Sequence, residues 1–121
     1  MLTKLIATLF LIIPVTAGLS ACAASESVEL SAGTVIIDVR TPAEFAGGHL
    51  EGALNIDVQS PAFAAQVSAL DPDADYFIYC RSGNRSGQAI VQMSNMGFSS
   101  MTNGGSVSNA SSLTGIPVVV D

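Results

Sequence analysis

Short, strongly apolar segments alternate with polar, turn-forming segments over most of this 121-residue chain. Residues 34–37 and 76–79 are continuous apolar runs, rich in β-branched or aromatic side chains. Such runs are typical of strands that are buried on both faces of a parallel sheet. Three further strands are expected, at 53–56, 98–102 and 116–120. Pro117 places the last of these at a sheet edge or at a strand entry, because proline cannot donate to a central ladder.

A short helix is expected directly after the first strand. Thr41 suits an N-cap, Pro42 suits the first helical position, and Glu44 stands three residues after the cap, where it can close a capping box. Gly47 and Gly48 are expected to end this helix.

Two longer helices are expected further along the chain. The first begins at Ser60-Pro61, and the second spans 86–96 and is capped by Gly97. Their apolar residues recur at helical spacing and should be buried: Phe63, Ala64, Val67 and Leu70 in the first, and Ala89, Ile90, Met93 and Met96 in the second. Residues 106–112 are rich in serine and asparagine and are a poor helix former. Strands alternating with helices predict a three-layer α/β domain with a mainly parallel sheet.

The N-terminus has the pattern of an export signal. Lys4 precedes an apolar run at 5–15, which is too short to span a bilayer comfortably. The sequence Leu19-Ser20-Ala21-Cys22 resembles the bacterial lipobox, which predicts a signal peptide at 1–21, a lipidated Cys22 with a tether at 22–31, and a domain at 32–121. The alternative is ordinary cleavage after Ala21-Cys22-Ala23, which would release a soluble periplasmic protein.

Length and charge exclude several classes of function. One small domain leaves no room for a two-domain dehydrogenase, a (β/α)₈ barrel or a kinase. Apart from Lys4, the cationic residues are Arg40, Arg81 and Arg85, against ten acidic residues. A chain this acidic repels phosphate backbones and anionic lipids. We therefore expect no nucleic-acid binding, and we expect membrane contact only through the lipid anchor.

Cys80 is the candidate reactive residue. Its only possible partner, Cys22, is acylated in one N-terminal interpretation and removed in the other, so Cys80 is expected to be a free thiol. It ends a buried strand and opens a loop at 80–85, where Gly83 permits a positive φ and several backbone N–H groups can point inward. A helix N-terminus and nearby arginines lower a cysteine pKa from about 8.5 into the range of roughly 3.5 to 7.5. The alternative is an inert core cysteine.

The arginines indicate the charge of the substrate. Arg40 follows one strand, and Arg81 and Arg85 follow another, at the sheet edge where parallel sheets usually bind ligands. Three arginines at one rim predict a small anionic substrate.

Several fragments together resemble a single rhodanese domain over most of residues 33–120. They are Asp38-Val39-Arg40 with Glu44-Phe45, Gly48-His49-Leu50-Glu51-Gly52-Ala53, Asn55-Ile56 and Cys80-Arg81-Ser82-Gly83-Asn84-Arg85-Ser86. The resemblance implies a rhodanese-like fold and a ping-pong sulfurtransferase. Cys80 would take sulfane sulfur from thiosulfate or a similar donor as a persulfide and pass it to cyanide, a protein thiol or an exported redox protein.

The same resemblance assigns the site residues. Cys80 is the nucleophile, and the loop residues Arg81, Ser82, Gly83, Asn84, Arg85 and Ser86 hold the persulfide and the donor oxyanions. No metal or organic cofactor is implied, and one histidine with one free cysteine cannot build a typical zinc site. Asp38 and Arg40 are supporting residues.

The supporting residues leave alternatives open. Asp38 could be a general base, but an architectural role is favoured. Arg40 could form a rim salt bridge, for example with Glu44, or could steer the substrate. His49 could form a triad with Cys80, although a turn-stabilising role is favoured.

Two other functions compete with sulfur transfer. Related phosphatases and arsenate reductases need a roomier C-x5-R loop, whereas Arg85 gives C-x4-R here. A non-catalytic docking module in the cell envelope is the other alternative, although such a module has no need of a reactive thiol. The chain also departs from the family where Asn109 stands at the usual position of a tryptophan after Gly104-Gly105, which leaves the last helix and the pocket wall open to change.

Overall fold

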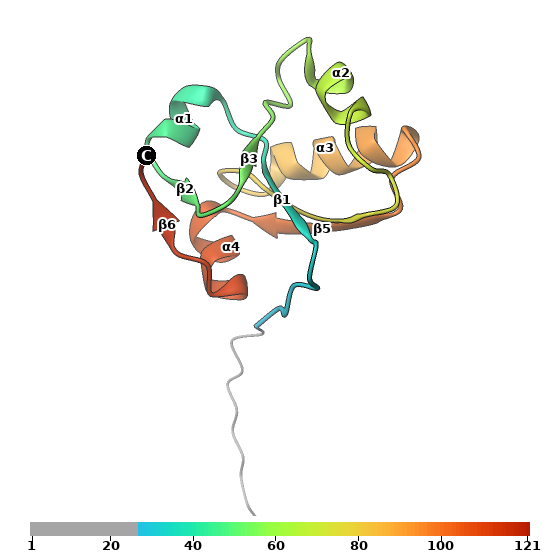
Figure 1. Ribbon diagram of the computed structural model, residues 1–121. Helices are drawn as coiled ribbons and strands as arrows, with labels where there is room; N and C mark the ends of the chain where they lie inside the picture. Colours follow the sequence, from blue (N-terminus) through green and yellow to red (C-terminus); the bar gives the residue numbers. More distant parts are fainter. Residues whose placement is uncertain (1–26) are drawn as a thin grey trace, which may run out of the picture.

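The computed structural model describes residues 27–121, which form a parallel sheet flanked by helices (Figure 1). Four parallel strands lie in the order β3-β1-β4-β5. Their bounds are β1 Val35–Asp38, β3 Leu54–Asn55, β4 Asp75–Tyr79 and β5 Ser100–Gly105. β2 (His49–Leu50) and β6 (Val118–Val119) pair antiparallel in a separate two-stranded sheet. The predicted α/β fold with a mainly parallel sheet is confirmed.

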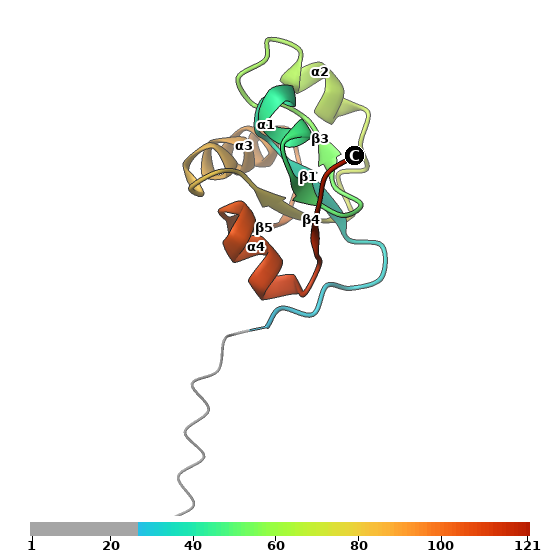
Figure 2. The same cartoon turned by 90° about the vertical axis from the view of Figure 1, so that its left-hand side faces the viewer.

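Helices cover both faces of the four-stranded sheet, which gives the predicted three layers (Figure 2). α2 (Phe63–Ser68) and α3 (Asn84–Asn95) pack on one face, and α4 (Val107–Thr114) packs on the other. α1 (Pro42–Ala46) follows β1 directly. Within residues 27–121 no helix combines the length and apolarity that a membrane crossing requires. Cys22 and the apolar run at 5–15 lie outside the described residues.

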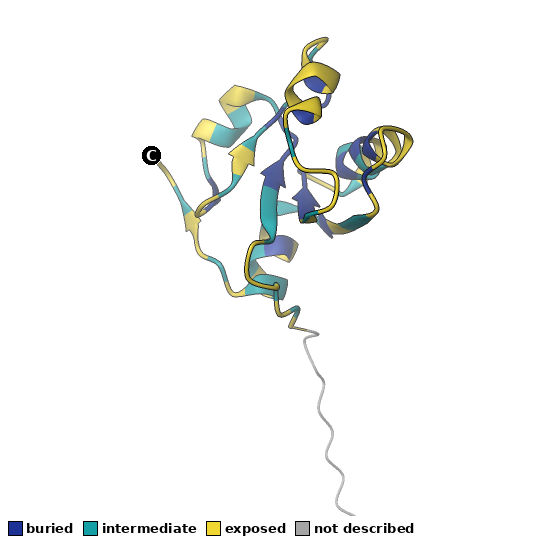
Figure 3. Cartoon of the chain, turned by 45° about the vertical axis from the view of Figure 1, so that its right-hand side comes forward, coloured by how far each residue is buried: buried dark blue, intermediate teal, exposed yellow. Residues whose placement is uncertain are grey.

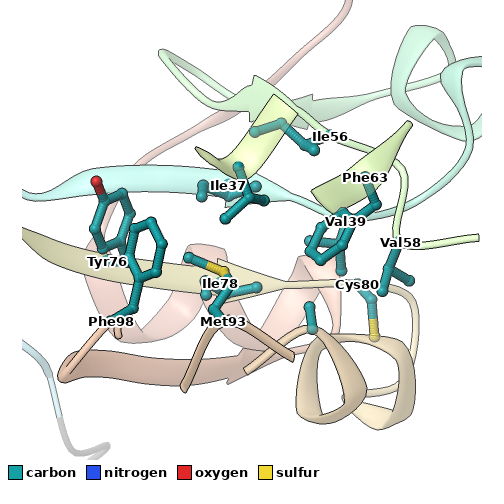
Figure 4. Packing of buried hydrophobic residues seen from close by; sticks show 12 residues of the cluster. Ile37, Val39, Ile56, Val58, Phe63, Tyr76, Ile78, Cys80, Met93 and Phe98 are labelled. Atoms are coloured by element: carbon teal, nitrogen blue, oxygen red, sulfur yellow. The ribbon is translucent and has the colours of Figure 1, made fainter. Parts of the chain in front are cut away.

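The alternation of side chains along β4 divides the core into two clusters. Tyr76, Ile78 and then Cys80 face α2 and α3, where they pack with Phe63 and Met93 (Figure 4). Phe77 and Tyr79 face the other way, together with Leu50 and Ala110. The central strands are therefore buried on both faces, whereas the outer sides of the helices are exposed (Figure 3).

The segment at 106–112 departs from the prediction, because it belongs to α4. Ser106 caps the helix by accepting a hydrogen bond from the Asn109 amide at 3.0 Å, and Gly115 ends it with a φ of 73°. Val107, Ala110 and Leu113 pack against Phe77 and Tyr79. Caps and tertiary packing thus outweigh the low intrinsic helix propensity of this segment.

Smaller differences concern the ends of elements and the burial of two side chains. α2 begins at Phe63 rather than at Ser60, and the short strand β2 was not expected. Ala64 and Met96 are exposed, although the helical spacing predicted them to be buried. The last strand, β6, pairs with β2 outside the main sheet, and Pro117 directly precedes it, which fits the predicted strand entry.

Gly104 lies so close to the core that we expect Gly104→Ala to destabilise the domain. A Cβ at this position would come within 2.5 Å of Phe77 Cε1 and 3.2 Å of Tyr79 Cβ. Overpacking of this kind costs about 1–3 kcal/mol, which urea denaturation would measure. Gly87→Ala, in α3, is the matched control. Its new Cβ would lie 3.7 Å from Asn103 Nδ2, which is an ordinary contact. Equal stability of Gly104→Ala and the unaltered chain would show that this contact is not tight.

Candidate active site

Cys80 lies at the carboxyl edge of the sheet, where the candidate residues gather. It follows β4, and its backbone N–H donates to Gly105 O at 2.9 Å, while Val39 N–H donates to Tyr79 O at 3.1 Å on the other side. The end of β4 is thus fixed to both neighbouring strands. Figure 4 shows the Cys80 side chain in the core cluster, on the side of the sheet that α3 covers.

The loop after Cys80 is shorter than predicted. α3 begins at Asn84, so the loop is 80–83, and Asn84, Arg85 and Ser86 form the first turn of the helix. Gly83 has a φ of 96°, as the sequence predicted, and this left-handed conformation favours glycine. On the outside of the turn, Ser82 Oγ accepts from Asn84 N at 3.5 Å and Asn84 Oδ1 accepts from Gln88 Nε2 at 3.1 Å.

The sulfur of Cys80 is surrounded by hydrogen-bond donors. The Gly83 amide donates to Sγ at 2.9 Å, and the Ser86 hydroxyl lies 3.4 Å away. Burial alone raises the pKa of the Cys80 thiol, because the side chain is fully covered. The Ser86 hydroxyl and the amides of Ser86, Ser82 and Gly83 outweigh burial, so the pKa lies below its ordinary value. The arrangement therefore stabilises a thiolate.

The side chain of Asn103 forms hydrogen bonds to the residues that surround Cys80, and the sequence analysis did not predict this role. Asn103 Nδ2 donates to Gly83 O at 3.0 Å, while its Oδ1 accepts from Gly105 N at 2.9 Å and from Ser86 Oγ at 2.7 Å. Asn103 is on β5 and is exposed, and nothing in its sequence neighbourhood indicated a contact with a loop twenty residues earlier.

Arg85 is held by a carboxylate. Its two terminal nitrogens donate to Glu44 Oε1 and Oε2 at 2.7 and 2.9 Å. These bonds lower the pKa of Glu44 to about 2, further helped by Thr41 Oγ1, which donates to Glu44 at 3.1 Å. The Thr41 N-cap is as predicted, since Oγ1 accepts from Glu44 N at 3.3 Å. The Glu44 carboxylate also binds Arg85 and so connects α1 to α3, while a hydrogen bond from the Thr41 backbone helps to lower its pKa, as the predicted capping box implies.

Protonation of Glu44 at low pH should lower the stability of the domain. The pKa of Glu44 is 4.5 when unperturbed and about 2 in the fold, so its contribution is complete above pH 4.5 and disappears as the pH falls towards 2. At pH 7, Glu44→Gln should therefore lower the unfolding free energy by about 1 kcal/mol or less, as expected of a partly exposed pair. Urea denaturation at several pH values would show this difference shrinking below pH 4.5. A difference that stays constant down to pH 2.5 would contradict the assignment.

Asp38 and Arg40 form a buried ion pair on the side of the sheet opposite to the Cys80 side chain. Asp38 accepts from Arg40 N at 2.9 Å, from Nε at 3.0 and 3.1 Å, and from NH2 at 2.6 Å. Arg40 NH2 also donates to Gly48 O at 2.6 Å. The salt bridge of Arg40 is therefore with Asp38, and the suggested pairing with Glu44 is wrong. Both oxygens of Asp38 are occupied, which fits an architectural carboxylate.

His49 is engaged away from Cys80. Its Nδ1 lies 2.9 Å from Phe45 O, its ring stacks on the Phe45 ring with 3.7 Å between centroids, and its Nε2 lies 3.1 Å from Asp121 Oδ2. His49 thus ties the end of α1 to the C-terminal segment, which fits the turn-stabilising interpretation.

A pocket of about 420 Å³ opens beside the loop. Its lining includes Arg40, Glu44 and Arg81, with Val107 and Val118 as apolar walls. Of the three arginines, Arg40 and Arg81 line this pocket, and Arg85 is paired with the lining residue Glu44. Asp38 neutralises Arg40, and Glu44 neutralises Arg85. Among the described residues, Arg81 is the arginine without a carboxylate partner, and it is exposed.

The position of the expected tryptophan is occupied by a small polar anchor. Asn109 Nδ2 donates to Gly104 O at 2.8 Å, next to the Gly105 carbonyl that receives the Cys80 amide. The last helix is therefore hydrogen-bonded to the end of β5, at Gly104.

The rest of the described chain offers less chemistry. A cavity of about 230 Å³ at the opposite end of the sheet is lined by residues such as Asp75 and Ser100, with no cysteine or arginine in its lining. In the part of the chain from 27 to 121, no three His, Cys, Asp or Glu side chains come close enough to hold a metal ion.

Known proteins resemble this chain in sequence and in fold. The family model described as "Rhodanese-like domain" matches residues 24–108. The chain is 33% identical to "Thiosulfate sulfurtransferase PspE" of Escherichia coli over 88 residues, 73% of this chain and 85% of that protein. It is 36% identical to "Sulfurtransferase" of Allochromatium vinosum over 87 residues, 70% of this chain and 78% of that protein. The solved "rhodanese with anions from E. coli" superposes with a TM-score of 0.60 at 30% identity, covering 73% of this chain and 99% of that structure.

Proposed function

Because this chain belongs to the rhodanese-like domain family, which includes sulfurtransferases, we propose that it transfers sulfane sulfur as a persulfide on Cys80. The observation that carries the proposal is the donor set around Cys80 Sγ, with the Gly83 amide at 2.9 Å and the Ser86 hydroxyl at 3.4 Å. A cysteine that only fills the core would lie among apolar groups and have a raised pKa. Here the hydrogen bonds lower the pKa of Cys80, which favours the nucleophile over the inert core cysteine.

The proposed reaction has two half-reactions. The Cys80 thiolate attacks the outer sulfur of the donor, a new S–S bond forms, and the old S–S bond breaks with its electron pair leaving on sulfite when the donor is thiosulfate. The resulting persulfide anion is attacked at its outer sulfur by the acceptor, and Cys80 leaves again as a thiolate. The amides of Ser82, Gly83 and Ser86 hold the negative charge on sulfur in both steps.

The charges at the rim support an anionic donor. Arg81 is exposed beside Cys80 and free of a carboxylate, whereas Arg40 and Arg85 are paired with Asp38 and Glu44. We therefore assign attraction of the donor to Arg81 and a supporting role to the other two arginines. Thiosulfate is the proposed donor because the name of the E. coli relative includes it, and a thiol or cyanide is the proposed acceptor.

Thiol reactivity distinguishes this proposal from the docking module. Cys80 should react with iodoacetamide at pH 6 faster than free cysteine, because a larger fraction of it is ionised. The modified fraction of the Cys80-containing peptide is measured by mass spectrometry. Reaction at or below the rate of free cysteine would favour a non-catalytic docking role.

The proposed location is the cell envelope, with the domain held at a membrane through Cys22. This proposal rests on the export-signal pattern and on Leu19-Ser20-Ala21-Cys22. Cells expressing the chain should incorporate radioactive palmitate into it, and Cys22→Ser should abolish the label. An unlabelled chain would instead indicate ordinary signal cleavage and release.

A further inference from the structure

The hydroxyl of Ser86 has one proton and three acceptors around it. Cys80 Sγ lies at 3.4 Å, Gly83 O at 3.0 Å and Asn103 Oδ1 at 2.7 Å. Ser86 is fully buried, so its proton must go to one of these three atoms. The atom that receives it decides whether Ser86 stabilises the charge on Cys80.

The Asn103 side chain ensures that the two acceptors competing for the Ser86 proton, Gly83 O and Asn103 Oδ1, have other hydrogen-bond partners. Gly83 O already accepts from Asn103 Nδ2 and from Gly87 N, both at 3.0 Å, and Asn103 Oδ1 already accepts from Gly105 N at 2.9 Å. The orientation of the amide follows from these partners, because Gly105 N can only donate and Gly83 O can only accept. Both competing acceptors therefore keep a partner when the Ser86 proton turns away from them.

We propose that Asn103 is a positioning residue that leaves the Ser86 hydroxyl free to donate to Cys80 Sγ when the sulfur is charged. In the neutral state, the thiol proton points to Ser86 Oγ and the Ser86 proton points to Asn103 Oδ1. When the thiol proton is lost to water, the Ser86 hydroxyl turns to the thiolate, where a bond to a charged atom is worth more than a bond to a neutral one. The inference concerns the same thiol as the proposed function and rests on its being the reactive one.

The other charged groups near Cys80 would not be altered by a change at Asn103. Arg85 of α3 interacts with the Cys80 charge and is paired with Glu44 of α1, and Asp57 before α2 acts on Arg85. Arg81 lies in the loop and is exposed. β5, which provides Asn103, contains no titratable residue, and neither does α2.

The test is the pH dependence of iodoacetamide alkylation of Cys80 in the full chain, measured on the Cys80-containing peptide by mass spectrometry. Ser86→Ala should raise the midpoint of this profile by about one pH unit, the value of one hydrogen bond to a charged group. Asn103→Leu should raise it by a similar amount, because the Ser86 proton is then drawn to Gly83 O. The double variant should move little further, since the two residues act through one hydroxyl.

Controls separate this role from a merely structural one. Thr102→Leu makes a similar change at the neighbouring exposed position of β5 and should leave the midpoint in place. Asn103→Ala removes the same amide without adding bulk or charge, and should also raise the midpoint if Asn103→Leu does not fold. A midpoint that Ser86→Ala raises but neither Asn103 variant moves would overturn the inference, as would additive shifts in the double variant. A midpoint near that of free cysteine in the unaltered chain would contradict the proposed function instead.

Discussion

Cys80→Ser is expected to abolish sulfur transfer while leaving the domain folded. Serine cannot form a persulfide, so the rate of thiocyanate formation from thiosulfate and cyanide should fall by at least about three orders of magnitude, to background. The side chain is fully buried but nearly the same size in both residues, and the Gly83 amide and Ser86 hydroxyl can still bind the new oxygen.

The fold of the variant is checked beside its activity. Circular dichroism and urea denaturation should give a transition close to that of the unaltered chain, so that lost activity is not lost structure. Retention of even a tenth of the activity in a folded Cys80→Ser sample would remove Cys80 from its role as sulfur carrier.

Asp38→Ala is expected to cause the largest loss of stability. Asp38 accepts hydrogen bonds from the backbone amide, Nε and NH2 of Arg40, and both side chains are buried. Removing the carboxylate leaves a buried guanidinium with Gly48 O as its remaining partner. Breaking a buried pair from one side costs about 3–5 kcal/mol, a large part of the stability of a small domain, and urea denaturation would measure it.

Removal of both partners is the matched control. The double variant Asp38→Leu/Arg40→Met replaces the pair with apolar groups and leaves no unpaired charge, so it should recover much of the loss. If Asp38→Ala costs less than about 1 kcal/mol, the guanidinium reaches water easily and the pair is not a buried one.

The sequence predicted those parts of the fold in which local pattern and tertiary environment agree. The continuous apolar runs became β1 and β4, and Thr41-Pro42 began α1, because burial on both faces and helix capping leave strong local signals. The signal is weaker in the segment of α4, since its serines and asparagine disfavour a helix. The Ser106 and Gly115 caps, together with the packing of Val107, Ala110 and Leu113 against the core, make it one.

The site likewise divides into residues that local sequence predicts and residues that only tertiary packing brings together. Cys80 and Gly83 were predicted because a strand end, a glycine and a helix start are adjacent in sequence, and Asp38 and Arg40 lie two residues apart at the end of one strand, on one face. Glu44 and Arg85 are separated by 41 positions, and Asn103 and Ser86 by 17. Pairs so distant are chosen by tertiary packing, and a single sequence contains no local trace of them.

The most direct test of the persulfide account is the intact mass of the chain after incubation with thiosulfate. The account predicts a gain of one sulfur atom that a thiol reductant removes and that Cys80→Ser does not show. A folded, unmodified chain whose Cys80 thiol nevertheless reacts rapidly with iodoacetamide would contradict thiosulfate as the donor. The absence of both reactions would contradict Cys80 as a sulfur carrier.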